Sequence, residues 1–148
     1  MVPIDRQELV LLMEAGYVYM GMGRFHEAKE VFEGVTVLQP ESEIPWVAIG
    51  TVHFAMRQYD QAIRHYKRAL QMKADSPFAR AYLGEALFFR GRKEEALAEL
   101  EKASLLDPSG TSGEFARSLS GVIKDGFTPP KGVPPKGASL KGVERSTS

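Results

Sequence analysis

The sequence predicts an all-α fold built from three consecutive helical hairpins. Glycine recurs at intervals of 34 residues, at Gly16, Gly50 and Gly84. Within each copy, apolar residues recur at steps of three and four, which places them on one face of a helix. Prolines stand between the copies, where a helix must end or begin. Three hairpins in register indicate a stack in which each unit buries its apolar face against its neighbour.

Two further columns repeat in the second half of each copy. The alanine column is Ala28, Ala62 and Ala96, and the column of large side chains is Phe32, Tyr66 and Leu100. Glycine and alanine leave space between the two helices of a hairpin, and the large side chain fills what remains. A glycine inside a helix costs about 1 kcal/mol relative to alanine. Its threefold recurrence therefore predicts that close packing offsets the cost, and we assign all three columns to the core.

The gapless alignment sets the bounds of the elements. A lead-in at 1–8 precedes hairpins at 9–42, 43–76 and 77–110. Turns within the hairpins are expected at 21–24, 57–58 and 91–92, where glycine or polar residues interrupt the apolar pattern. The segment 111–125 is expected to form a seventh helix from about Ser112 to Lys124, with Ser112 as its N-cap. Such a helix would cover the last exposed face of the stack.

The final segment, 126–148, has a different composition. It contains Pro-Pro-Lys-Gly twice and carries a net charge of +3, which leaves −3 for the rest of the chain. A sequence of this kind cannot bury a core, so we expect it to be extended or disordered. We assign no function to it.

Composition excludes several classes of protein. The 148 residues are 43% hydrophobic and 26% charged, with a formal net charge of zero and no cysteine. A balanced charge argues against a nucleic-acid partner, because neutralising phosphates requires a positive excess. No apolar run approaches the roughly 18 residues that span a bilayer, and the N-terminus lacks the plan of a signal peptide. We expect a cytoplasmic protein that does not insert into a membrane.

The sequence contains no catalytic or metal-binding constellation. His26, His53 and His65 are not spaced as i, i+4 ligands on one helix, and thiolate ligands are absent. We expect His53 to be a packed core residue. The glycines of 21–23 are expected in a turn rather than in a phosphate-binding loop. The sequence therefore predicts a protein that is not an enzyme and that holds neither a cofactor nor a metal.

The repeated pattern is similar to that of the tetratricopeptide repeat (TPR) family. The second copy matches it most fully, at Trp46, Ile49, Gly50, Tyr59, Ala62, Tyr66 and Ala69. Departures occur elsewhere: Leu12 and Arg80 stand where Trp46 stands, and Lys93 replaces Phe25 and Tyr59. The resemblance covers residues 9–110. It implies a right-handed superhelix whose inner wall, formed by the first helix of each hairpin, binds another polypeptide.

The residues expected to line this groove follow from the resemblance. They are Val10, Met13, Tyr17 and Met20 of the first copy, Ile44, Val47, Thr51 and Phe54 of the second, and Phe78, Ala81, Glu85, Phe88 and Phe89 of the third. The first helix is apolar nearly all round, which is typical of a helix that is covered on both sides. An apolar patch of this size is typical of a protein-binding site.

The chemistry of the wall selects among ligands. Some TPR domains hold a C-terminal carboxylate with lysines and asparagines, but the set contains no cation, and Glu85 would repel a carboxylate. The wall instead suits apolar side chains of a helix or an extended segment. The same residues could also pack against Met1–Glu8, the C-terminal tail or a second copy of the chain.

A narrower resemblance is to the small TPR chaperones of bacterial type III secretion systems. It is carried by the stretch 15–19, with 31–34 and 84–87. It implies a chaperone or assembly factor that keeps a secretion subunit soluble before export. The alternatives are a structural adaptor subunit of a multiprotein complex and a homo-oligomer, such as a homodimer, whose groove is self-occupied.

Overall fold

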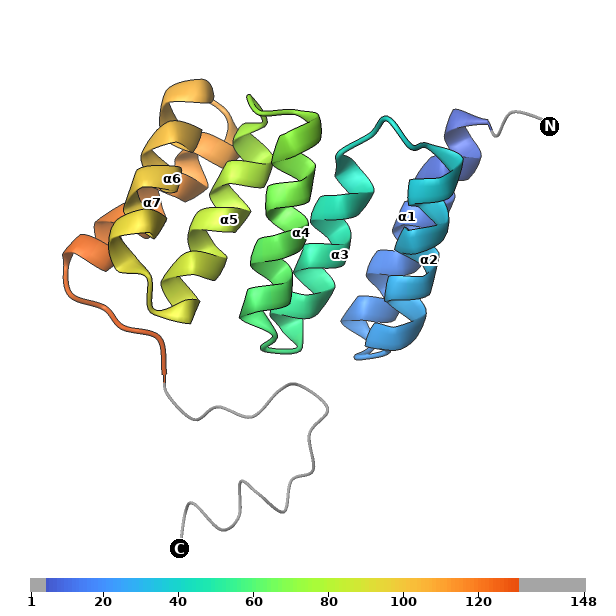
Figure 1. The fold of residues 1–148 in the computed structure, drawn as a ribbon, viewed down its shortest axis with the longest axis horizontal. Helices are drawn as coiled ribbons and strands as arrows, with labels where there is room; N and C mark the ends of the chain where they lie inside the picture. The colour runs from blue at the N-terminus through green and yellow to red at the C-terminus, as the bar shows by residue number, and fades with distance from the viewer. Residues whose placement is uncertain (1–4, 131–148) are drawn as a thin grey trace, which may run out of the picture.

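The computed structural model describes residues 5–130, which form seven α-helices and no strand (Figure 1). The helices are α1 (Arg6–Gly21), α2 (Phe25–Leu38), α3 (Ile44–Ala55), α4 (Tyr59–Met72), α5 (Pro77–Arg90), α6 (Lys93–Leu106) and α7 (Thr111–Lys124). They follow one another along the stack as hairpins α1–α2, α3–α4 and α5–α6, closed by α7. The expectation for the tail beyond residue 130 lies outside the described residues. The all-α fold predicted from the repeat is confirmed.

Tight turns join the two helices of each hairpin. Gly23 and Gly91 adopt φ angles of 76° and 96°, in the left-handed region that glycine tolerates without strain. The second hairpin makes its turn with Arg57 at a φ of 63°. Prolines at or next to the first position of α3 and α5 fit because the amide that proline lacks would have no partner there.

Two helix starts differ from the sequence expectations. The first helix begins at Arg6 rather than Leu9, because Asp5 and Glu8 form a capping box around its first turn. The last helix begins at Thr111, and Gly110 rather than Ser112 stands at its N-cap. There the Asp107 carboxylate accepts a hydrogen bond from the Gly113 amide at 3.1 Å. Ser112 therefore lies inside the helix and does not cap it.

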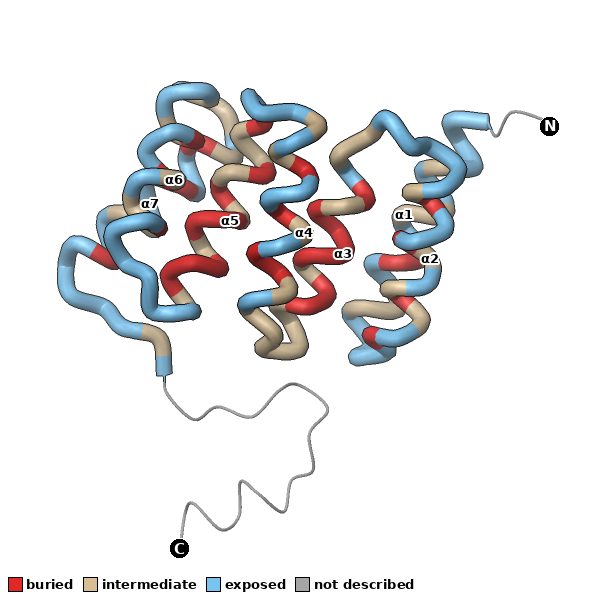
Figure 2. Tube along the Cα trace, in the orientation of Figure 1, coloured by how far each residue is buried: buried red, intermediate tan, exposed pale blue. Residues whose placement is uncertain are grey.

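The repeated columns form the core. All six members of the alanine and large-residue columns are 0% exposed. A methyl group at Gly84 would lie 2.6 Å from Cγ of Leu100, and Gly16 faces the ring of Phe32 in the same way. Figure 2 shows the buried stretches concentrated on α3 and α5 in the middle of the stack. The assignment of these columns to close packing is therefore confirmed.

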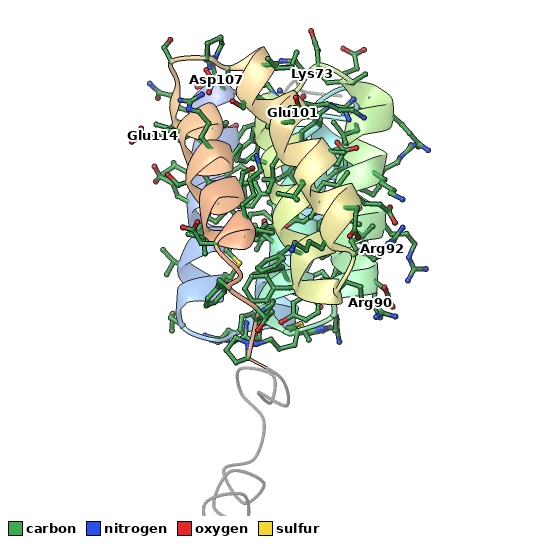
Figure 3. The ribbon with its side chains drawn as sticks, turned by 90° about the vertical axis from the view of Figure 1, so that its left-hand side faces the viewer. Lys73, Arg90, Arg92, Glu101, Asp107 and Glu114 are labelled. Carbon is green, nitrogen blue, oxygen red and sulfur yellow. The ribbon has the colours of Figure 1, made fainter. Side chains whose placement is uncertain are left out.

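The helices form two layers. The first helix of each hairpin and α7 make an inner layer, and the second helices make an outer layer. Within the inner layer α3 packs on α5 and α5 packs on α7. The end view in Figure 3 shows α6 and α7 side by side, with charged side chains such as that of Glu114 on the outside.

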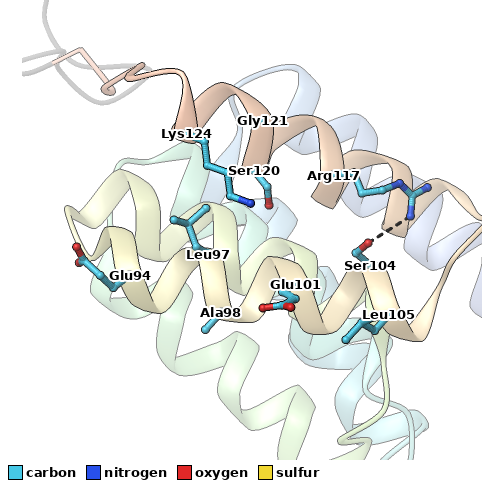
Figure 4. A pocket seen from close by; sticks show the side chains of 10 residues that line it. All are labelled: Glu94, Leu97, Ala98, Glu101, Ser104, Leu105, Arg117, Ser120, Gly121 and Lys124. Carbon is cyan, nitrogen blue, oxygen red and sulfur yellow. Dashed lines mark hydrogen bonds between the residues drawn. The ribbon is translucent and has the colours of Figure 1, made fainter.

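Helix α7, the last of the stack, differs in its surface residues from the first helices of the three hairpins. The positions at which earlier first helices contact their own second helix are occupied in α7 by Glu114, Arg117, Ser118 and Gly121, which are all exposed. Its opposite face buries Ala116 and Ile123. A hollow of about 700 Å³ remains between α6 and α7, lined by Leu97 and Leu105 as well as by charged and small residues, and Arg117 donates to Ser104 there at 3.3 Å (Figure 4).

The opposite end of the stack is apolar and open. Leu11 and Val18 of α1 are 62% and 60% exposed. Val52 stands at the same register position as Val18 and is fully buried, because α2 packs against α3. No described helix precedes α1, so only Gly16 of this helix is buried. The covering on both sides that its sequence predicts is therefore absent within residues 5–130.

None of the helices within residues 5–130 has the length and apolar character needed to cross a membrane.

Candidate functional site

The candidate site is the inner face, defined as the face of α1, α3 and α5 that points away from α2, α4 and α6. Three of the thirteen residues assigned to it are exposed: Val10, Tyr17 and Ile44. Seven are half-buried: Met13, Met20, Thr51, Phe54, Phe78, Glu85 and Phe89. Val47, Ala81 and Phe88 are buried in the core and offer almost no surface. The contact surface open to a ligand is therefore smaller than the full set.

An opening on this face lies between α1 and α3. It is a hollow of about 410 Å³ lined mainly by the apolar residues Val10, Met13, Tyr17 and Ile44, and Arg6 and Glu14 of α1 and Val35 of α2 also line it. The edge of the Tyr17 ring packs on Phe32 with ring centroids 5.1 Å apart, which fixes the tyrosine in the wall. Four of the expected groove residues thus meet around one apolar depression.

The middle of the inner face carries polar groups. The hydroxyls of Thr51 and Tyr66 lie 3.0 Å apart, and the Thr51 hydroxyl also donates to the carbonyl of Val47 at 3.0 Å. The ring of Tyr66 stacks near that of Tyr82, with centroids 6.0 Å apart. Burial raises the pKa of Glu85 to about 7. Within residues 5–130 the Glu85 carboxylate has no ion pair or hydrogen bond.

Aromatic rings extend the inner face toward α7. Phe78 meets Tyr82 edge to face at 5.0 Å, and Tyr82 lies 6.1 Å from Phe115 of α7. The sequence pattern did not place Tyr82 in the groove, because its counterparts Glu14 and Ala48 share no chemistry with it. Phe115 stands five residues into α7, as Met13, Val47 and Ala81 stand in their copies. If α7 is aligned as the first helix of a fourth copy, this register places Phe115 in the groove from the sequence alone.

The segment after α7 covers one end of the face. At this end, the ring of Phe54 packs on the rings of Phe89 and Tyr59, with ring centroids 5.1 and 5.4 Å apart. The ring of Phe127 lies 6.2 Å from that of Phe88, and residues 126–130 border a hollow of about 560 Å³ beside it. Phe88 is 4% exposed and belongs to the main core cluster, so this expected groove residue is a core residue.

His53 has the structural role expected from the sequence. It is 8% exposed, its Nδ1 lies 2.7 Å from Oε1 of Gln58, and its ring stacks on His65 at 4.9 Å. The glutamine oxygen can only accept, so Nδ1 carries the proton. Burial lowers the pKa of His53, which favours the neutral ring.

Comparison with protein families supports the repeat assignment. Two family models described as tetratricopeptide repeat match residues 10–42 and 53–113, which together make up more than half of the chain. A TPR repeat-containing thioredoxin from Arabidopsis thaliana is 36% identical over 97 residues, or 66% of this chain. The match spans only 26% of that relative, so the chain corresponds to about a quarter of its length.

Solved structures share the fold. The type III secretion translocator chaperone SycD of Yersinia enterocolitica superposes with a TM-score of 0.73 at 24% identity, covering 81% of this chain and 92% of that one. PcrH of Pseudomonas aeruginosa, in complex with the chaperone binding region of PopB, gives a TM-score of 0.70 at 17% identity, covering 83% and 99%. Both matches extend beyond the repeats to most of the described residues.

The 34-residue columns, the stacked hairpins and the two family models agree, and the chain belongs to the tetratricopeptide repeat family.

Proposed function

We propose that this chain is a polypeptide-binding chaperone or assembly factor that holds an apolar segment of a partner protein against its inner face. The observation that carries the proposal is the hollow between α1 and α3, where Val10, Tyr17 and Ile44 remain exposed around an apolar depression. Exposed apolar surface of this kind is costly unless a partner covers it. A groove with aromatic and methionine side chains suits the alternating side chains of a bound segment.

The kind of chaperone is proposed from the likeness of fold. PcrH was solved with the chaperone binding region of PopB, which is a partner polypeptide bound to a stack of similar size. By analogy, we propose a cytoplasmic, non-enzymatic protein of the type III secretion chaperone kind, with a secretion subunit as its client. A permanent adaptor subunit would use the same face, but its complex would persist whereas a client would leave.

The test begins with a partner recovered from the native host and identified by mass spectrometry. The binding segment of that partner is then titrated into purified protein. Val10→Glu combined with Ile44→Glu should weaken binding at least tenfold, since two charges would be buried against apolar side chains. The matched control is Val37→Glu combined with Leu105→Glu, which are 79% and 73% exposed on the outer layer. Equal binding by both double variants would refute the inner-face proposal.

Light scattering tests the alternative in which a second copy of the chain occupies the groove. A monomer at micromolar concentration that binds the partner is the expected result. A dimer that loses its association in the Val10 and Ile44 double variant would instead show that a second copy occupies the groove.

A further inference from the structure

Glu85 is the one carboxylate among the thirteen inner-face residues. Its counterparts in the first and second copies are Tyr17 and Thr51, which are neutral. It lies on α5, one turn after Ala81 and one turn before Phe88 and Phe89, so apolar residues flank it along the helix. A charged group at this point of an apolar wall needs a physical explanation.

The carboxylate is half-buried and unpaired. No cation or donor within residues 5–130 reaches it by an ion pair or hydrogen bond, in contrast to Glu99 of α6, which pairs with Arg80 at 2.7 Å. A segment lying in the groove would cover Glu85 further. Covering an ionised carboxylate without a partner is unfavourable, and a basic side chain in the bound segment removes this cost by pairing with it.

The surroundings favour a cation as the partner of Glu85. Tyr82 lies one turn before Glu85 on α5, and its ring stacks near that of Tyr66 with centroids 6.0 Å apart. In the first copy, the aromatic Tyr17 of α1 stands at the register position of Glu85. Aromatic faces attract lysine and arginine side chains, and a carboxylate among them adds a charge-assisted hydrogen bond. The net charge of −3 that the sequence carries ahead of its last 23 residues favours the approach of a basic segment.

We propose that Glu85 receives a lysine or arginine side chain of an extended segment bound in the groove, whose apolar neighbours fill the hollow between α1 and α3. This inference rests on the proposed function and adds a rule of specificity to it. The preferred ligand is a basic residue with apolar residues on both sides, and an acidic residue at the same place is rejected.

A random dodecapeptide library displayed on phage tests the rule whatever the identity of the partner. Selection is performed in parallel on the full wild-type chain, on Glu85→Gln, which keeps the shape of the side chain, and on Glu101→Gln, a carboxylate change on the exposed face of α6. Circular dichroism confirms that all three are folded. The wild-type and Glu101→Gln pools should share an enrichment of lysine or arginine at one position between apolar residues. The Glu85→Gln pool should keep the apolar positions and lose the basic one.

Synthetic peptides then measure how much the basic residue contributes to the binding affinity. A selected peptide should bind the wild-type chain about tenfold more tightly than its Lys→Gln version, as expected for one charge-assisted hydrogen bond. Glu85→Gln should bind both versions within about twofold, because only the pair carries the discrimination. Peptides that depend on Val10 and Ile44 but show no basic preference would overturn this inference and leave the proposed function standing. A library that yields no peptide dependent on Val10 and Ile44 would overturn both.

Discussion

Gly50 of α3 lies directly against the ring of Tyr66 of α4, so that a methyl group at Gly50 would stand 2.5 Å from Cε1 of that ring. Tyr66 is 0% exposed and its hydroxyl lies 3.0 Å from that of Thr51. The ring therefore has no free space into which it can move. This contact explains why the glycine column recurs in every copy despite the cost of glycine within a helix.

Gly50→Ala should lower the free energy of unfolding by about 1–2 kcal/mol, because overpacking outweighs the gain in helix propensity. Gly34→Ala is the matched control, since no atom lies within 4 Å of a methyl group at that exposed helical position. The control should raise the stability by about 0.5–1 kcal/mol. Urea denaturation measures both, and a stabilising effect of Gly50→Ala would contradict the close packing.

Val18 and Val52 share one register position but differ in burial. Val52→Thr buries a hydroxyl in the core and should cost about 1–3 kcal/mol. Val18→Thr should change the stability by less than about 0.5 kcal/mol, since Val18 is 60% exposed. A large loss for Val18→Thr in a dilute monomer would show that another part of the chain covers the open edge of α1.

The repeat pattern predicted most of the fold but only part of the candidate site. Register determines which residues of α1, α3 and α5 share a face, and the glycine columns determine how closely the hairpins pack. Burial at the site depends on contacts outside the repeat. Phe88 also contacts Phe127, which belongs to a segment outside the repeat. Tyr82 and Phe115 meet across two helices, although Tyr82 does not match its column in chemistry and Phe115 lies outside the three hairpins.

Glu85 should make the stability fall as the pH rises. Its pKa is raised from 4.5 to about 7 in the folded protein, so between these values the native state holds more protons than the unfolded state. Stability is then lost as the pH passes upward through this window. Glu85→Gln should melt at a higher temperature than the wild type at pH 8 and at nearly the same temperature at pH 4.5. Glu101→Gln should show no such difference between the two pH values.

The titration of His53 should make the stability fall as the pH decreases. Burial lowers its pKa below 6.5 in the folded state, so the unfolded state binds more protons and stability falls as the pH drops below about 6.5. His53→Leu, which copies Leu87 of the third hairpin, should remove this part of the acid dependence. His26→Leu serves as the control, because the His26 side chain is 83% exposed. An unchanged acid dependence in His53→Leu would contradict the assignment.

Site-specific photo-crosslinking in the native host shows whether the inner face binds a partner polypeptide. A crosslinking amino acid is placed at Tyr17 or Ile44 on the inner face, and at Val37 or Leu105 on the outer layer. Tyr17 and Ile44 should give an adduct with one and the same partner polypeptide, whereas Val37 and Leu105 should give none. An adduct formed only from the outer positions would contradict binding at the inner face.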